Sequence, residues 1–268
     1  MKLNVVPAAA GAQWVRAGIR TFFRRPVALT GLFFMFMAAL SLVVIVPVVG
    51  GIVALVLVPA FTVGLMDATR AADAGRFPLP GILFVAFHQG KAHARAMLWV
   101  GALYALAVLC VVGVSALIDG GQFAQMYVGG GGGLSAERME DPRFLAALWV
   151  STLLYLPVSL AFWYAPALVH WYGVTPAKSL FFSVVAVLRN ARAFLVYGLL
   201  WTALSLGVGL LMMLVLLMTT SHSDIALATM AMFPLSVVLA AMFFSSLWFT
   251  FMGSFQADDD ALIDTPET

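Results

Sequence analysis

The chain has 268 residues, of which 63% are hydrophobic and only 10% are charged, and its mean hydropathy is +1.03. A soluble domain uses about 25% charged residues to cover its surface, so this composition excludes an ordinary water-soluble protein. The formal net charge is only +2, and we expect no nucleic-acid partner.

Six long stretches contain no Asp, Glu, Lys or Arg, and each is long enough to cross a bilayer as a helix, which takes roughly 20 apolar residues. They are residues 27–46, 48–66, 96–118, 144–169, 194–218 and 225–255. Their continuous apolarity favours helices over a β-barrel, whose strands alternate apolar and polar residues. The sequence therefore predicts an all-α polytopic membrane helix bundle, with one integral membrane domain over residues 1–256.

The first two stretches are nearly continuous. Residues 27–66 would form about 60 Å of helix at 1.5 Å per residue, which is enough for two crossings. Pro47, Gly50 and Gly51 lie at the midpoint, where a helix would stop and turn. We predict a tight hairpin of two spans here, and a re-entrant pair is the alternative.

The six stretches group into three hairpins, and each is preceded by a segment with basic residues that is predicted to form an amphipathic interfacial helix, near residues 12–25, 80–95 and 176–192. In the first segment, Arg16, Arg20 and Arg24 recur every four residues opposite an apolar stripe. This pattern is typical of an amphipathic helix lying in the membrane interface. In the second segment, His88, Lys91 and Arg95 are expected on one helical face. The candidate contacts to anionic lipid in the three segments are Arg16, Arg20, Arg24, Arg25, Lys91, Arg95, Arg189 and Arg192. The alternative is that these residues only fix the topology.

The basic residues are distributed unequally between the two sides that six crossings define. Arg138 and Arg143 lie on one side, and the other twelve lie on the side that holds both termini. Because positively charged loops stay in the cytoplasm, the sequence predicts a multi-pass protein of the bacterial inner membrane with cytoplasmic N- and C-termini.

The largest connection, residues 119–143, is predicted to lie outside the cytoplasm and contains five consecutive glycines at residues 129–133. A phosphate-binding loop would need a preceding strand and a following Lys-Ser or Lys-Thr pair, so we interpret the glycines as a flexible linker. Residues 257–268 form an acidic tail that is predicted to be disordered and cytoplasmic.

Two pairs of small residues have the four-residue spacing that allows helices to approach closely: Ala60 with Gly64, and Ser205 with Gly209. They predict helix packing, either within the chain or with a second copy. Tyr155 and Pro157 lie deep in the fourth stretch and are candidates for lining a cavity. For Tyr155, a hydroxyl bonded to a neighbouring helix is the favoured interpretation.

The sequence offers little catalytic chemistry. The six stretches hold no acidic or basic side chain, which weakens a proton-coupled mechanism. His88 and His93 are five residues apart, which is not the i, i+4 spacing of a helical metal pair, and His222 with Asp224 reads as a solvated loop pair. We therefore expect that the protein is not an enzyme and that it has no cofactor and no bound metal.

Residues 22–50 (FFRRPVALTGLFFMFMAALSLVVIVPVVG) and 115–127 (SALIDGGQFAQMY) resemble an uncharacterised family of betaproteobacterial six-span inner-membrane proteins of unknown function. Residues 173–193 (GVTPAKSLFFSVVAVLRNARA) are more weakly similar to a motif of YciC-like proteins and of the membrane domain attached to some glycerophosphodiester phosphodiesterases. Pro176, Ser179, Ser183 and Asn190 carry that pattern. The resemblance implies the fold and the location. No phosphodiesterase activity carries over, because the chain lacks that catalytic domain.

Two functions fit these observations. The first is a non-catalytic structural, assembly or membrane-homeostasis role. Its partners would be anionic lipid headgroups at the cytoplasmic face and a membrane protein, either a different one or a second copy of this chain. The alternative is a transporter or channel for a small or apolar substrate, which a water-filled cavity at Tyr155 and Pro157 would favour.

Overall fold

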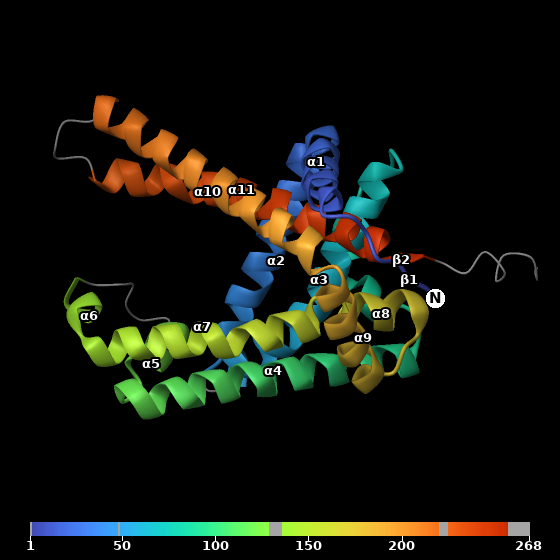
Figure 1. Ribbon diagram of the computed structural model, residues 1–268, viewed down its shortest axis with the longest axis horizontal. Coiled ribbons are helices and arrows are strands. Elements are labelled where there is room, and N and C mark those ends of the chain that lie inside the picture. Colours follow the sequence, from blue (N-terminus) through green and yellow to red (C-terminus); the bar gives the residue numbers. More distant parts are fainter. Residues whose placement is uncertain (1, 48, 129–135, 220–224, 257–268) are drawn as a thin grey trace, which may run out of the picture. The chain divides into compact units, whose positions relative to one another are not determined.

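A computed structural model describes residues 2–47, 49–128, 136–219 and 225–256. Helices dominate the described chain, as Figure 1 shows. In chain order the elements are β1 (Lys2–Leu3), α1 (Ala9–Arg24), α2 (Pro26–Val44), α3 (Val49–Asp73), the 3-10 helix η1 (Pro80–Phe87), α4 (Lys91–Asp119), α5 (Gln122–Val128), α6 (Ala136–Glu140), α7 (Pro142–Phe162), α8 (Ala165–Tyr172), α9 (Pro176–Arg189), α10 (Ala191–Thr219), α11 (Ile225–Ser254) and β2 (Phe255–Gln256). The two short strands pair antiparallel, with Leu3 opposite Phe255.

Six helical segments of the described chain are long and apolar enough to cross a membrane. They are Pro26–Val44, Val49–Asp73, Lys91–Asp119, Pro142–Tyr172, Ala191–Val215 and Met232–Ser254. The predicted all-α polytopic fold is confirmed. Residues 257–268, which were predicted to form the acidic tail, and residues 129–133 with the five glycines lie outside the described residues.

The first two spans are separate helices. The α2 helix ends at Val44, and α3 begins at Val49. The amide of Gly50 donates to the carbonyl of Val46 at 2.9 Å, and a Cβ built on Gly50 would collide with the carbonyl oxygen of Val43. Glycine at this position therefore lets the chain reverse within a few residues.

The helices pack into two compact units, formed by the described parts of Met1–Ala38, Phe61–Val85 and Val185–Thr268 and by Ala39–Ala60 with Ala86–Val184. In the first unit α1 packs along α10 and α11 (Figure 1). A Cβ built on Gly18 would lie 2.6 Å from the Cα of Ser246, so the two backbones are in close contact. Trp14 meets Phe194 edge to face, with ring centroids 5.5 Å apart.

This packing differs from the interfacial helix expected over residues 12–25. A helix does form there, but its apolar side, which includes Trp14, Val15 and Phe22, is buried against other helices of the protein. That apolar stripe is therefore occupied by protein rather than being free to enter lipid.

The expectation of one helix over residues 80–95 is wrong. The 3-10 helix η1 ends at Phe87, and α4 begins at Lys91. Between them Gly90 has a φ of +98°, a conformation that interrupts a helix and that glycine adopts without strain. His88 therefore does not share a helical face with Lys91 and Arg95, which lie one turn apart at the start of α4.

In the second unit α4 packs against α7 and α8. The predicted fourth span, residues 144–169, is interrupted at Trp163 and Tyr164, between α7 and α8. The predicted 119–143 connection contains α5 and α6. Asp119 starts α5 by accepting from the amides of Gly121 at 2.8 Å and Phe123 at 2.6 Å, as carboxylates do at helix N-termini.

Candidate functional site

The basic residues of α1 are exposed, and they differ in whether they form an ion pair. Arg24 contacts Asp73 at the end of α3, with 3.1 Å between Nη1 and Oδ1, and Thr21 donates to the same carboxylate at 3.1 Å. Arg16 and Arg20 are exposed and form no ion pair with a described residue. The end of α1 is thus fastened to α3, while two of its arginines are free to bind an anion.

Arg25 follows α1 directly. Its Nη2 donates to the carbonyl of Gly75 at 3.4 Å, and its guanidinium lies 5.9 Å from the ring centroid of Phe77. An arginine has five N–H donors, so donors of Arg25 remain for a further ligand. The other predicted lipid contacts, which are Lys91, Arg95, Arg189 and Arg192, are all exposed near helix ends.

An apolar groove of about 670 Å³ lies in the first unit, between α1, α2 and α11. The groove residues that matter most are Phe23 of α1, Val27, Gly31 and Phe34 of α2, and Phe233 and Val237 of α11. Phe23, Val27, Phe34 and Phe233 are more than half exposed. This surface, called the α1–α2–α11 groove below, was not predicted from the sequence.

A second groove of about 670 Å³ lies between α10 and α11, which run side by side in Figure 1. Its lining includes Trp201, Ser205, Gly209, Ser236 and Phe243. A Cβ built on Gly209 would meet nothing within 4 Å. The predicted packing pair Ser205 and Gly209 therefore faces open space in the described chain.

The other predicted packing pair lies in a contact within the chain. Ala60 is buried, and a Cβ built on Gly64 would lie 2.6 Å from the Cα of Leu83 in η1. Gly64 thus lets η1 approach the backbone of α3.

Tyr155 and Pro157 lie on the exposed side of α7. The Tyr155 hydroxyl is 3.0 Å from the hydroxyl of Tyr104 on α4, which corresponds to the favoured interpretation of this tyrosine. Neither residue lines the two grooves described above.

The break between α7 and α8 is closed by a residue from α9. The fully buried Ser183 donates its hydroxyl to the carbonyl of Leu160 at 2.7 Å and accepts from the amide of Tyr164 at 3.0 Å. Broken membrane helices can expose such groups to a substrate. Here one side chain satisfies a freed carbonyl and a freed amide.

The structure brings together two histidines that sequence reasoning kept apart. His93 Nε2 lies 3.3 Å from His170 Nδ1, and Gln89 Nε2 lies 3.3 Å from His170 Nε2. Within the described part of the chain, no group of three or more His, Cys, Asp and Glu side chains is placed to hold a metal ion. His222 lies outside that part. No local sequence signal links residues 77 positions apart.

Asn190 joins the two ends of the first unit. Its Oδ1 accepts from the amide of Val6 at 2.9 Å, and its Nδ2 donates to the carbonyl of Asn4 at 3.0 Å. The same Nδ2 lies 3.5 Å from the Oγ of Ser254 at the end of α11. The weaker resemblance had pointed to Asn190 and Ser183, although it did not indicate these roles.

The all-α fold and its six long apolar helices define a multi-pass α-helical membrane protein. The chain is 40% identical over 272 residues to a probable inner membrane protein of Burkholderia thailandensis, and the match covers 100% of this chain and 99% of the relative. The chain belongs to the family of that inner membrane protein, which confirms the family and the membrane expected from residues 22–50 and 115–127.

No family model matches the chain, and no solved structure matches it. The weaker resemblance to YciC-like proteins and to phosphodiesterase membrane domains stays a prediction.

Proposed function

We propose that the protein is a non-catalytic structural component of the inner membrane that acts through helix contacts, and that its α10–α11 groove receives a second copy of the chain. The observation that carries the proposal is the open groove that contains Ser205 and Gly209. Membrane helices associate through small residues that let backbones approach and through hydroxyl groups that bond across the interface.

The burial of α10 supports this proposal. In the most apolar stretch within Ala191–Val215, only 6% of the residues are buried. Trp201, which lines the groove, is buried within the chain itself. A two-fold dimer would place the same groove of each copy against the other.

The alternative role, a transporter or channel for a small or apolar substrate, would be expected to use the break between α7 and α8. Ser183 already bonds the carbonyl and the amide freed there. The broken backbone is therefore poorly suited to hold a substrate, and this favours the structural role.

Replacing Gly209 with leucine tests the contact. The added side chain fills the groove, and we expect the dimer dissociation constant in mild detergent to rise by about tenfold, because such close contacts contribute about 1–2 kcal/mol. Light scattering across a concentration series measures the shift. Gly207→Leu is the control, since a Cβ there also meets nothing within 4 Å and Gly207 does not line the groove. A wild-type chain that stays monomeric, or equal weakening by both variants, would contradict the proposal.

We also propose that both termini face the cytoplasm. Twelve of the fourteen basic residues support this orientation. A fluorescent reporter that folds only in the cytoplasm, fused after Thr268, is expected to be bright, and alkaline phosphatase at the same position is expected to be inactive. Active phosphatase there would refute the orientation.

A further inference from the structure

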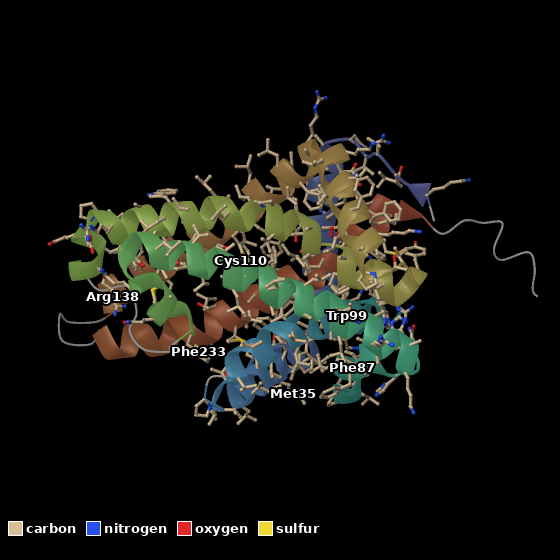
Figure 2. All side chains as sticks on the ribbon, turned by 90° about the horizontal axis from the view of Figure 1, so that it is seen from below. Met35, Phe87, Trp99, Cys110, Arg138 and Phe233 are labelled. Atoms are coloured by element: carbon tan, nitrogen blue, oxygen red, sulfur yellow. The ribbon has the colours of Figure 1, made fainter. Side chains whose placement is uncertain are left out.

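The α1–α2–α11 groove has an apolar lining, and basic residues precede its α2 side in the sequence. Its volume of about 670 Å³ falls within the roughly 300–1,000 Å³ that is typical of ligand sites. Its lining is apolar apart from Thr30, and Phe233 marks its α11 side (Figure 2). Such a lining offers water few hydrogen-bond partners, so the occupant that suits this groove is a hydrocarbon chain.

Three arginines are close in sequence to the residues of α1 and α2 that line the groove. Arg24 and Arg25 stand in sequence between two lining residues, Phe23 and Pro26. Arg20 lies one helical turn before Phe23 and Arg24, and residues three and four apart on a helix are neighbours. Arg24 is engaged by Asp73, whereas Arg20 has no ion pair with a described residue and Arg25 has donors left over. This end of the groove therefore has a positive charge that is only partly neutralised.

The arginines directly precede the α2 side of the groove along the chain. Arg24 and Arg25 immediately precede the apolar span Pro26–Val44. From Pro26 to Phe34 the lining extends about 12 Å along α2 at 1.5 Å per residue. A phosphate held by the arginines would thus have its acyl chain beside Val27, Gly31 and Phe34.

We propose that this groove is a binding site for an anionic phospholipid, with the phosphate at the end that carries Arg20, Arg24 and Arg25 and one acyl chain along α2 and α11. The positive charge of the arginines favours this occupant over a second membrane helix. An apolar helix would leave the arginine end without a counter-charge, whereas an anionic headgroup supplies one. The site is separate from the Ser205 and Gly209 contact, and either can fail without the other.

Native mass spectrometry of the full-length protein in detergent tests the site. The protein is titrated with phosphatidylglycerol and with phosphatidylcholine of the same acyl chains, and we expect the wild type to prefer phosphatidylglycerol. Arg20→Gln is expected to reduce that preference about fivefold, which is the contribution of one basic residue at a membrane surface. Arg143→Gln, at the start of α7, is the matched control and should leave the preference unchanged.

A second variant tests whether an acyl chain occupies the apolar part of the groove. A Cβ on Gly31 would meet nothing within 4 Å, so Gly31→Leu can fold while its side chain occupies the groove. We expect it to weaken phosphatidylglycerol binding about tenfold, as losing roughly two buried methylene groups would, and Gly207→Leu should have no effect. Equal lipid binding by the two leucine variants, or no phosphatidylglycerol preference in the wild type, overturns the proposal. A wild-type dimer that Gly31→Leu alone dissociates also overturns it, because a second copy would then occupy the groove.

Discussion

Replacing Gly101 with alanine is expected to lower the free energy of unfolding by about 2–3 kcal/mol. Gly101 lies on the buried side of α4. A Cβ there would collide with the carbonyl oxygen of Val56 on α3 and would lie 2.9 Å from the carbonyl carbon of the same residue. The obstacle is backbone, which cannot rotate away as a side chain does, so the helices must separate. Forcing extra atoms into a packed contact typically costs about 1–3 kcal/mol.

Gly113 on the same helix supplies the control for Gly101. A Cβ on Gly113 would meet nothing within 4 Å, and alanine is favoured over glycine in a helix by about 0.5–1 kcal/mol. The two Gly→Ala variants should therefore move the unfolding transition in opposite directions, which denaturant titration of the detergent-solubilised protein measures. Shifts of the same sign and size would mean that α4 is not packed against the backbone at Val56.

The glycine contacts show which part of the packing can be predicted from sequence. The spacing of Ala60 and Gly64 pointed to a close approach, and Gly64 does lie against Leu83. Gly101 and Ala105 have the same spacing and are both buried, so the same spacing also marks the close contact of α4. Gly11 and Gly18 are seven residues apart, on one side of α1, and each meets the backbone of a neighbouring helix. The spacing of the glycines could be predicted to favour close contacts, but the residue that each glycine contacts is known only from the structure.

The apolar stripe of α1 shows what the sequence could not decide. A helix with one apolar side can lie on a membrane or pack against its own protein, and both produce the same periodicity. The outcome here depends on Gly18, which lets α1 approach Ser246, a residue more than 200 positions away. The continuous apolar run over residues 144–169 likewise concealed the break before Ala165, because the side chain that stabilises it, Ser183, belongs to another helix.

The six spans and their approximate ends, by contrast, follow from chain chemistry alone. Apolar stretches long enough to cross the bilayer leave helices as the simplest way to satisfy the backbone, and Pro47 with Gly50 marks the reversal between the first two. The two grooves depend on how α10 and α11 lie beside their neighbours. A composition that is apolar throughout the spans does not distinguish a residue that lines a groove from one that faces lipid.

Asn190→Leu is expected to lower the free energy of unfolding by about 2–3 kcal/mol and to expose the first residues to protease. Leucine is close to asparagine in size but cannot replace its bonds to the amide of Val6 and the carbonyl of Asn4. Each buried polar group left without a partner costs about 1–3 kcal/mol. Both lost bonds hold the N-terminal segment to Asn190, between α9 and α10. The backbone amide of Asn4 separately donates to the carbonyl of Ser254 at the end of α11, at 2.9 Å.

Asn4→Ala separates this role from a general loss of polar contacts in the same place. It removes one side-chain bond, from Asn4 Nδ2 to the carbonyl of Gly253 at 3.1 Å, and leaves both backbone bonds to Asn190 intact. We expect a loss of about 1 kcal/mol and an N-terminus that stays protected. Limited proteolysis followed by mass spectrometry distinguishes the two variants. If Asn4→Ala released the N-terminus as readily as Asn190→Leu, the side-chain bond from Asn4 to Gly253 would hold the segment as much as Asn190 does, and the proposed role of Asn190 would be wrong.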